Sequence, residues 1–289
     1  MPLFQVDAFT DAPFSGNPAG VYVTDAFPPD DWMQHLAAEM NLSETAFVVP
    51  RATATAPARY ALRWFTPTDE VDLCGHATLA AAHILTSDQT GASAGSESGP
   101  LELTFETASG PLKATRTRSA PRTHSGAISL DFPADPPRPM EAPAGLLDAL
   151  GVANPVFVGK GDRDVLIHVR DPQSVLSCTP DMDAVAGIDA RGVIVTAAAG
   201  EQHDGADFIS RCFFPAVGVP EDPVTGSAHC ALGPYWAERL GRTKLVGRQV
   251  SPRGGVVGVT ATAEGRVELT GHAVTVFRGG LSPLARPDA

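Results

Sequence analysis

One local pattern occurs twice in the chain, and this repeat limits the folds available to it. The segment RWFTP at residues 63–67 is followed by GHA at residues 75–77, and RCFFP at residues 211–215 is followed by GSA at residues 226–228. Each copy predicts a strand, a polar loop and a tight glycine turn into a buried helix. The repeat favours two similar lobes. The helix N-terminus in each copy would offer unpaired N–H groups to a small anion such as a carboxylate.

Length and composition agree with a two-lobed globular protein. At 289 residues the chain is near the upper limit for one hydrophobic core, and its 43% hydrophobic and 19% charged residues are ordinary for a globular protein. We expect lobes at residues 1–118 and 126–289, with a linker at residues 116–122. Predicted strands far outnumber predicted helices, so the pattern favours an α+β fold over a nucleotide-binding βαβ fold, and no phosphate-binding loop occurs.

Charge and cysteine usage limit the binding partners and the cellular compartment that we expect for this chain. The net charge of −12 argues against nucleic acid or an anionic membrane as the main partner. The apolar stretches are too short to span a bilayer, and the N-terminus lacks the features of a signal peptide. The four cysteines, Cys74, Cys178, Cys212 and Cys230, follow no metal-binding spacing. We therefore expect free thiols, no metal and a cytoplasmic location.

His76 is the first candidate for a role in chemistry. It follows Gly75 at the expected start of the first buried helix, with Cys74 adjacent and Asp72 four residues earlier. A capping or hydrogen-bonded core histidine is the ordinary alternative. The polar neighbours, and a glycine that lets a ligand approach the backbone, favour a site.

The second copy of the repeat offers a different set of groups. Thr225, Gly226 and Ser227 begin the second helix and could form a carboxylate-binding nest, although plain N-capping by Thr225 or Ser227 is the alternative. Glu221 and Asp222 precede them. In an extended segment these two acids point to opposite sides, so only one can face a ligand, and a surface role for both is the alternative.

Glu44 is the third candidate. It lies between Leu42 and the apolar residues 46–49, where contact with water is expected to be poor. Burial disfavours the charged carboxylate and moves its pKa toward the range useful for proton transfer. An exposed acid at the start of a strand is an equal alternative from the pattern alone.

Cys74 is a candidate nucleophile or thiol base, because a helix N-terminus favours the thiolate. Its alternative is a small buried residue in a turn. A racemase that uses two thiols needs a second cysteine at the equivalent position. Aligning the copies on Gly75 and Gly226 places Thr225 there, and Cys230 falls one turn into the helix. A two-thiol mechanism is therefore not favoured.

Five segments together resemble the PhzF-like family of phenazine biosynthesis. They are QVDAF at 5–9, GNP at 16–18, NLSETAF at 41–47, DLCGHAT at 72–78 and EDPVTGSAH at 221–229. Their order and spacing match the family over nearly the whole chain. The resemblance implies a diaminopimelate-epimerase-like fold, in which two similar lobes each wrap a curved sheet around a central helix and the active site lies between them. It also implies a homodimer that needs no cofactor.

The family chemistry implied by this resemblance is the isomerisation of a dihydro-hydroxyanthranilate, in which a proton moves between carbons of a cyclic amino acid. Glu44 then looks like the acid/base group, with His76 and Asp222 as polar partners that hold or protonate the substrate. The residues implied to bind the substrate carboxylate, or to lie near it, are Ser43, Gly75, Gly226 and Ser227. The second thiol of proline racemases is replaced here, as in other PhzF-like proteins.

Two other functions stay open at this point. One is an amino-acid racemase or epimerase that uses Glu44 with Cys74 or Asp222. The other is a non-catalytic binding protein on the same fold, which the intact set of Glu44, His76 and Asp222 argues against. The sequence predicts a small carboxylate as substrate without identifying it.

Overall fold

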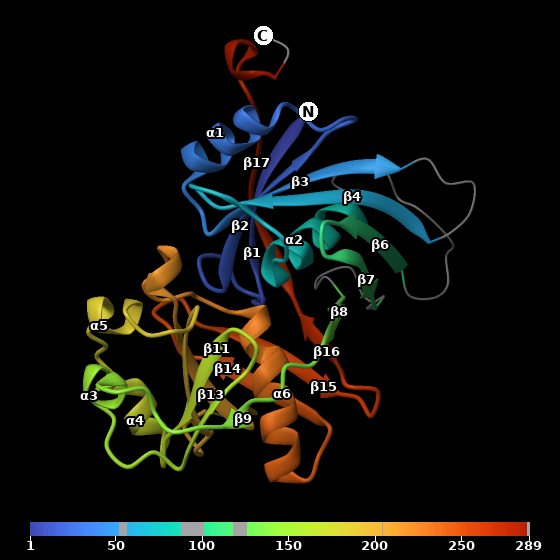
Figure 1. The fold of residues 1–289 in the computed structure, drawn as a ribbon. Coiled ribbons are helices and arrows are strands. Elements are labelled where there is room, and N and C mark those ends of the chain that lie inside the picture. The colour runs from blue at the N-terminus through green and yellow to red at the C-terminus, as the bar shows by residue number, and fades with distance from the viewer. Residues whose placement is uncertain (52–56, 88–100, 118–125, 204, 288–289) are drawn as a thin grey trace. The chain divides into compact units, whose positions relative to one another are not determined.

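The chain divides into two units, and each contains one long buried helix (Figure 1). In the computed structural model, residues 1–51, 57–87, 101–117, 126–203 and 205–287 are described. Unit 1 comprises Met1–Asp131 and Thr270–Ala289, and unit 2 comprises Phe132–Leu269. The chain passes from one unit to the other within β8 (Ile128–Pro133) and again within β16 (Arg266–Gly271).

Unit 1 is built on strands that alternate parallel and antiparallel pairings. β2 runs parallel to β3, β3 antiparallel to β4, β4 parallel to β6, and β6 antiparallel to β7. β1 pairs antiparallel with both β2 and β17. The elements of this unit other than β8 are β1 (Pro2–Ala8), β2 (Asn17–Val23), α1 (Asp30–Met40), β3 (Glu44–Arg51), β4 (Ala58–Phe65), β5 (Glu70–Val71), α2 (Gly75–Thr86), β6 (Leu101–Thr107), β7 (Gly110–Arg116), β17 (Ala273–Gly280) and η3 (Pro283–Ala285).

Unit 2 repeats this order of pairings. β11 runs parallel to β12, β12 antiparallel to β13, β13 parallel to β14, and β14 antiparallel to β15. Its elements other than β16 are β9 (Arg138–Pro139), α3 (Leu146–Leu150), β10 (Phe157–Lys160), β11 (Asp164–His168), α4 (Pro172–Leu176), α5 (Met182–Ala186), β12 (Gly192–Ala198), β13 (Phe208–Phe213), η2 (Pro215–Val217), α6 (Gly226–Leu240), β14 (Lys244–Gln249) and β15 (Gly255–Ala261).

The predicted duplication is confirmed by this topology. In unit 1, α2 follows β4 and precedes the strand that pairs parallel with β4. In unit 2, α6 follows β13 and precedes the strand that pairs parallel with β13. The two helices begin at the glycines that the repeat predicted, Gly75 and Gly226. The α+β class, with a mixed sheet around a central helix in each unit, is therefore correct.

Helix α2 is buried on all sides. Every residue from His76 to Leu85 is buried, and the small side chains of the GHATLAAAHILT segment let strands β1, β2, β3, β7 and β17 approach it closely. A helix that is apolar around its whole circumference is typical of a core position. Helix α6 packs in the same way against β14 and β15 of its own unit (Figure 1).

The repeated arginines perform the same structural task in both units. Arg63 donates two hydrogen bonds to the carboxylate of Glu70, both at 2.7 Å, and Arg211 donates two to Glu221, at 2.7 and 2.8 Å. Bidentate pairs of this kind are strong and directional. Each pair fixes the loop that leads from the repeated strand into the buried helix.

The boundary of the second lobe differs from the sequence-based expectation. The second lobe was predicted to extend over 126–289, but β17 pairs with β1, so Thr270–Ala289 belongs to unit 1. Most of the expected linker at 116–122 lies outside the described residues.

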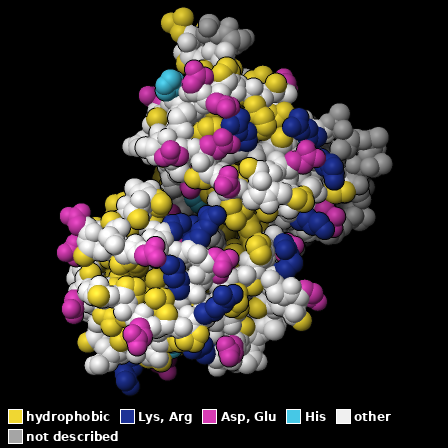
Figure 2. Space-filling view, viewed as in Figure 1, with side chains coloured by type: hydrophobic (Ala, Val, Ile, Leu, Met, Phe, Trp, Pro, Cys, Tyr) yellow, Lys and Arg dark blue, Asp and Glu magenta, His cyan; other side chains and the backbone are white. Residues whose placement is uncertain are grey.

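Charged side chains of both signs are interspersed on the face shown in Figure 2, in line with an acidic chain that has no large basic area on that face. Among the described residues, no helix is both long and apolar enough to cross a membrane.

Candidate active site

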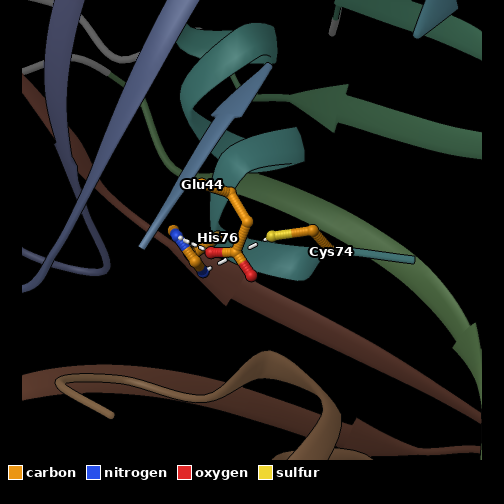
Figure 3. Close-up of side chains that lie close together, drawn as sticks. All are labelled: Glu44, Cys74 and His76. Atoms are coloured by element: carbon orange, nitrogen blue, oxygen red, sulfur yellow. Dashed lines mark hydrogen bonds and ion pairs between the residues drawn. The ribbon is translucent and has the colours of Figure 1, made fainter. Parts of the chain in front are cut away.

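Three predicted residues of unit 1 converge at the start of α2 (Figure 3). Glu44 is the first residue of β3, Cys74 is the N-cap of α2, and His76 is the second residue of that helix. The side chains point toward one another although Glu44 is far from the other two in sequence. The buried helix start and the neighbouring strand therefore build a polar cluster inside an apolar unit.

The central contact of this cluster joins Glu44 and His76. Oε2 of Glu44 lies 3.1 Å from Nε2 of His76, and the side chains are 19% and 6% exposed. Both atoms are buried, and the geometry of the contact is that of an ion pair rather than of a hydrogen bond. Buried polar atoms are normally hydrogen-bonded, so a carboxylate oxygen and an imidazole nitrogen left in this state are typical of a functional site.

The other ring nitrogen of His76 has two neighbours. Nδ1 lies 3.3 Å from Nδ2 of Asn17 and 3.6 Å from Sγ of Cys74. The side-chain oxygen of Asn17 accepts a hydrogen bond from Ser43 at 3.1 Å. Ser43 immediately precedes Glu44, so the polar contacts run in a closed path from Glu44 through His76 and Asn17 back to the same turn of the chain.

Burial and charge act in opposite directions on His76. Burial disfavours the imidazolium, but the contacts of the ring with Cys74 and with the Glu44 carboxylate outweigh it and raise the pKa of His76 well above the ordinary 6.5. Burial and Glu44 also raise the pKa of Cys74, so this thiol is neutral near pH 7. The Glu44 carboxylate is therefore the group that holds a proton on His76.

The same three residues offer one oxygen, one nitrogen and one sulfur atom within 4.8 Å of one another, as a metal site would. In the structure these atoms contact one another: Sγ of Cys74 lies 3.6 Å from Nδ1 of His76, and Oε2 of Glu44 lies 3.1 Å from Nε2. That the chain uses no metal remains a prediction.

In unit 2 the two consecutive acids have separate roles. Glu221 is bound by Arg211, whereas Asp222 is 8% exposed and accepts a hydrogen bond from Oγ1 of Thr225 at 2.5 Å. Gln249 donates to the backbone oxygen of Asp222 at 2.7 Å and accepts from the backbone N–H of Thr225 at 2.9 Å. These bonds fix Asp222 directly before α6.

The first turn of α6 carries the remaining predicted residues. Gly226 is buried, and Oγ of Ser227 accepts a hydrogen bond from Nη2 of Arg191 at 2.9 Å. Arg191 is itself held by Asp164, with Nε donating to Oδ1 at 2.9 Å, and by the ring of Phe214. The N-cap side chains of α2 and α6, Cys74 and Thr225, make no capping hydrogen bond, so simple N-capping by Thr225 is not its role.

The structure thus brings the predicted residues together in two groups. Ser43, Glu44, Gly75 and His76 lie at the start of α2, and Asp222, Gly226 and Ser227 lie at the start of α6. Sequence reasoning missed three polar residues that support them: Asn17, Arg191 and Gln249. Asn17 lies in the GNP segment, which was a usable signal, whereas nothing in the local sequence distinguishes Arg191 or Gln249.

Comparison with known proteins agrees with this architecture. Residues 6–279 match the family of phenazine biosynthesis-like proteins, PhzC-PhzF. An uncharacterized isomerase of Halalkalibacterium halodurans is 46% identical over 282 residues, which cover 97% of this chain and 98% of that protein. The crystal structure of a PhzF-family phenazine biosynthesis protein from Enterococcus faecalis superposes with a TM-score of 0.81 at 41% identity, over 96% of this chain and 97% of that one. A hydroxyproline epimerase from Agrobacterium vitis shares the fold alone, with a TM-score of 0.59 at 15% identity, over 99% of this chain and 94% of that one.

A duplicated sheet-and-helix fold, together with a full-length relative that is named an isomerase, defines the class: the protein is an isomerase built on the epimerase-type fold. Within that class, the chain belongs to the phenazine biosynthesis-like PhzC-PhzF family.

Proposed function

We propose that this isomerase moves a proton between two carbons of a small carboxylate, with Glu44 as the group that removes and returns the proton. The observation that carries the proposal is the contact between Oε2 of Glu44 and Nε2 of His76, 3.1 Å apart and both buried. A general base must be positioned within reach of the proton that it removes. His76 positions the carboxylate, because its Nε2 lies 3.1 Å from Oε2 of Glu44.

The proposed reaction is balanced without any redox step. A carbon–hydrogen bond of the substrate breaks, its electron pair stays on the substrate, and the proton forms an O–H bond on Glu44. The O–H bond then breaks as a new carbon–hydrogen bond forms at a second carbon. Negative charge builds on the substrate between the two steps, and the N–H groups at the start of α2, beginning with Gly75, are suited to stabilise it. We therefore propose that no cofactor takes part.

We assign Asp222, Gly226 and Ser227 to substrate binding in the same reaction. Ser227 supports this role, because its hydroxyl oxygen accepts a hydrogen bond from Arg191 and its own hydrogen is left to donate to a ligand oxygen. The N–H groups that begin α6 and the nearby charge of Arg191 favour an anionic group. Ser43 donates a hydrogen bond to Asn17, and we assign it a role in positioning the polar groups beside Glu44.

The thiol alternative has less support. Cys74 is 6% exposed, and burial raises the pKa of its thiol, so little thiolate is present near pH 7. The position equivalent to Cys74 at the start of α6 is Thr225, which cannot serve as a second thiol base. A directional proton shift by a carboxylate is thus favoured over racemisation by two thiols. We further propose a homodimer that acts in the cytoplasm.

The test is hydrogen exchange in D2O with a panel of cyclic and acyclic amino acids and carboxylates, followed by NMR. We expect the wild-type protein and Cys74→Ser to introduce deuterium at carbon in at least one compound, and Glu44→Gln to lose this activity. The opposite pattern, with loss in Cys74→Ser and retention in Glu44→Gln, would assign the chemistry to the thiol. A wild-type protein that exchanges no member of the panel would contradict the proposal.

A further inference from the structure

Asn17 occupies a position that the proposed chemistry does not yet explain. It is the first residue of β2 and has no exposed surface. Its side-chain amide lies between Ser43, which donates to Oδ1 at 3.1 Å, and His76, whose Nδ1 is 3.3 Å from Nδ2. It therefore contacts the ring nitrogen of His76 that faces away from Glu44.

The hydrogens of this arrangement are constrained. An amide nitrogen only donates, so in the orientation shown Nδ1 of His76 is an acceptor, and the ring hydrogen of His76 is on Nε2. The neutral Cys74 thiol lies 3.6 Å from Nδ1 and can act as a second donor to this nitrogen, which fits the same neutral form of His76. A doubly protonated His76 would instead place an N–H against the NH2 group of Asn17.

A half-turn of the amide removes that conflict. Oδ1 of Asn17 would then accept from Nδ1–H of His76, and Nδ2 would donate to Ser43, because a hydroxyl can either donate or accept. The Asn17–Ser43 pair can therefore satisfy both protonation states of His76 without any movement of the backbone. A hydrocarbon side chain could satisfy neither state, and a carboxylate would satisfy only the protonated one.

The backbone fixes Asn17 in place for this task. Gly16 has a φ of +68°, and a Cβ there would collide with the carbonyl oxygen of Ala8, so the turn before Asn17 has one conformation. Within the part of the chain that the structure describes, the titratable groups that act on His76 are Glu44 on β3 and Cys74 at the start of α2. Asp7 on β1, which also packs against α2, accepts a hydrogen bond from the backbone N–H of Phe14 at 2.7 Å.

We propose that Asn17 is a positioning residue that determines which nitrogen of His76 carries a proton and, with Ser43, accommodates the change in protonation of His76 during turnover. The role in turnover rests on the proposed function. The effect on the protonation of His76 does not, and it can be measured without a substrate.

The test is a pH titration of ¹⁵N-histidine-labelled protein by NMR, with the His76 signals assigned by their absence in His76→Gln. Asn17→Asp supplies a permanent acceptor to Nδ1–H, so the His76 midpoint should rise by about one pH unit or more. Asn17→Ala removes both the donor that serves neutral His76 and the acceptor that serves protonated His76. Because the hydrogen bond from the charged ring is the stronger of the two, the midpoint should fall. A purely structural role of Asn17 would not move the midpoint in opposite directions in the two variants.

Activity provides the second readout, with the compound that the D2O panel identifies. In Asn17→Ala, kcat should fall by about ten- to a hundredfold while KM changes little, because Asn17 acts through His76. If both variants fold, as judged by circular dichroism, and the His76 midpoint equals that of wild type, the inference is wrong. If the midpoints move as stated but the wild-type protein exchanges no compound, the positioning role stands and the proposed function fails.

Discussion

Arg211 donates two hydrogen bonds to the carboxylate of Glu221, and this pair lies immediately before Asp222 in the chain. Both side chains are 15% exposed, and Arg211 also donates to the backbone oxygen of Cys178 at 2.6 Å. The equivalent pair in unit 1 joins Arg63 to Glu70. The same type of Arg–Glu pair therefore occurs in both units. Only in unit 2 is the glutamate of the pair followed directly by a proposed site residue.

This relationship predicts an activity effect for Glu221→Gln. The neutral amide loses the bidentate charged pair, which should lower the free energy of unfolding by about 1–3 kcal/mol and loosen the loop that carries Asp222. We expect a higher KM in exchange assays. Glu70→Gln is the control. Arg63 keeps its hydrogen bond to Asp30 at 2.7 Å, so we expect a smaller loss in urea unfolding and a smaller change in KM. Equal effects of the two variants on KM would show that the Arg211 pair has no special link to the site.

Stability should depend on pH through His83. Burial, assisted by the charge of Arg116, lowers the pKa of His83 to about 4, below the ordinary 6.5. The folded protein thus binds fewer protons than the unfolded chain between these values. Its free energy of unfolding should fall as the pH drops from about 6.5 to about 4, by up to about 1.4 kcal/mol per pH unit for this group.

Urea unfolding at several pH values in this interval, with His83→Gln, checks the prediction. Glutamine can keep the contact that Nε2 of His83 makes with Thr275 at 3.0 Å, and it does not titrate. The slope of the free energy of unfolding against pH should decrease by the amount that one bound proton contributes. His35→Gln, at an exposed position on α1, serves as the control and should leave the slope unchanged. An unchanged slope in His83→Gln would contradict the assignment.

Gly16→Ala should be strongly destabilising. The residue has a positive φ, and the added Cβ would meet the backbone oxygen of Ala8, which cannot move aside without disturbing β1. Gly110→Ala is a useful comparison, because Gly110 also has a positive φ, of +100°, but open space around it. We expect a fall in melting temperature for both variants, and a clearly larger one for Gly16→Ala. Similar melting temperatures would show that the turn before Asn17 can relax.

Much of the fold follows from local sequence. Gly75 and Gly226 mark the starts of α2 and α6 because each precedes a run of small and apolar residues that can only be buried. The pairing of β17 with β1 could not be predicted, because it joins the two ends of the chain and no local pattern reports such a contact. The boundary of the second lobe was misplaced for this reason.

The candidate site, like the fold, could be predicted only in part from the sequence. Glu44 and His76 were predicted as separate candidates, each with an ordinary alternative, and their contact follows only from the placement of β3 beside α2. No local sequence pattern indicated Arg191, because its role depends on a hydrogen bond to Ser227, which is distant in the sequence of unit 2. Glu221 and Asp222 were expected to face different ways, and their partners, Arg211 and Thr225, do differ.

The most direct test of the central claim is the rate of carbon–hydrogen exchange in Glu44→Gln relative to wild type, with the compound that the D2O panel identifies. Glutamine preserves the shape of Glu44 but cannot take up a proton, so the rate should fall by about 10²–10⁴ while circular dichroism stays unchanged. Glu102→Gln, at an exposed position on β6, should exchange at the wild-type rate. A Glu44→Gln protein that is folded and exchanges the substrate as fast as wild type would contradict the account.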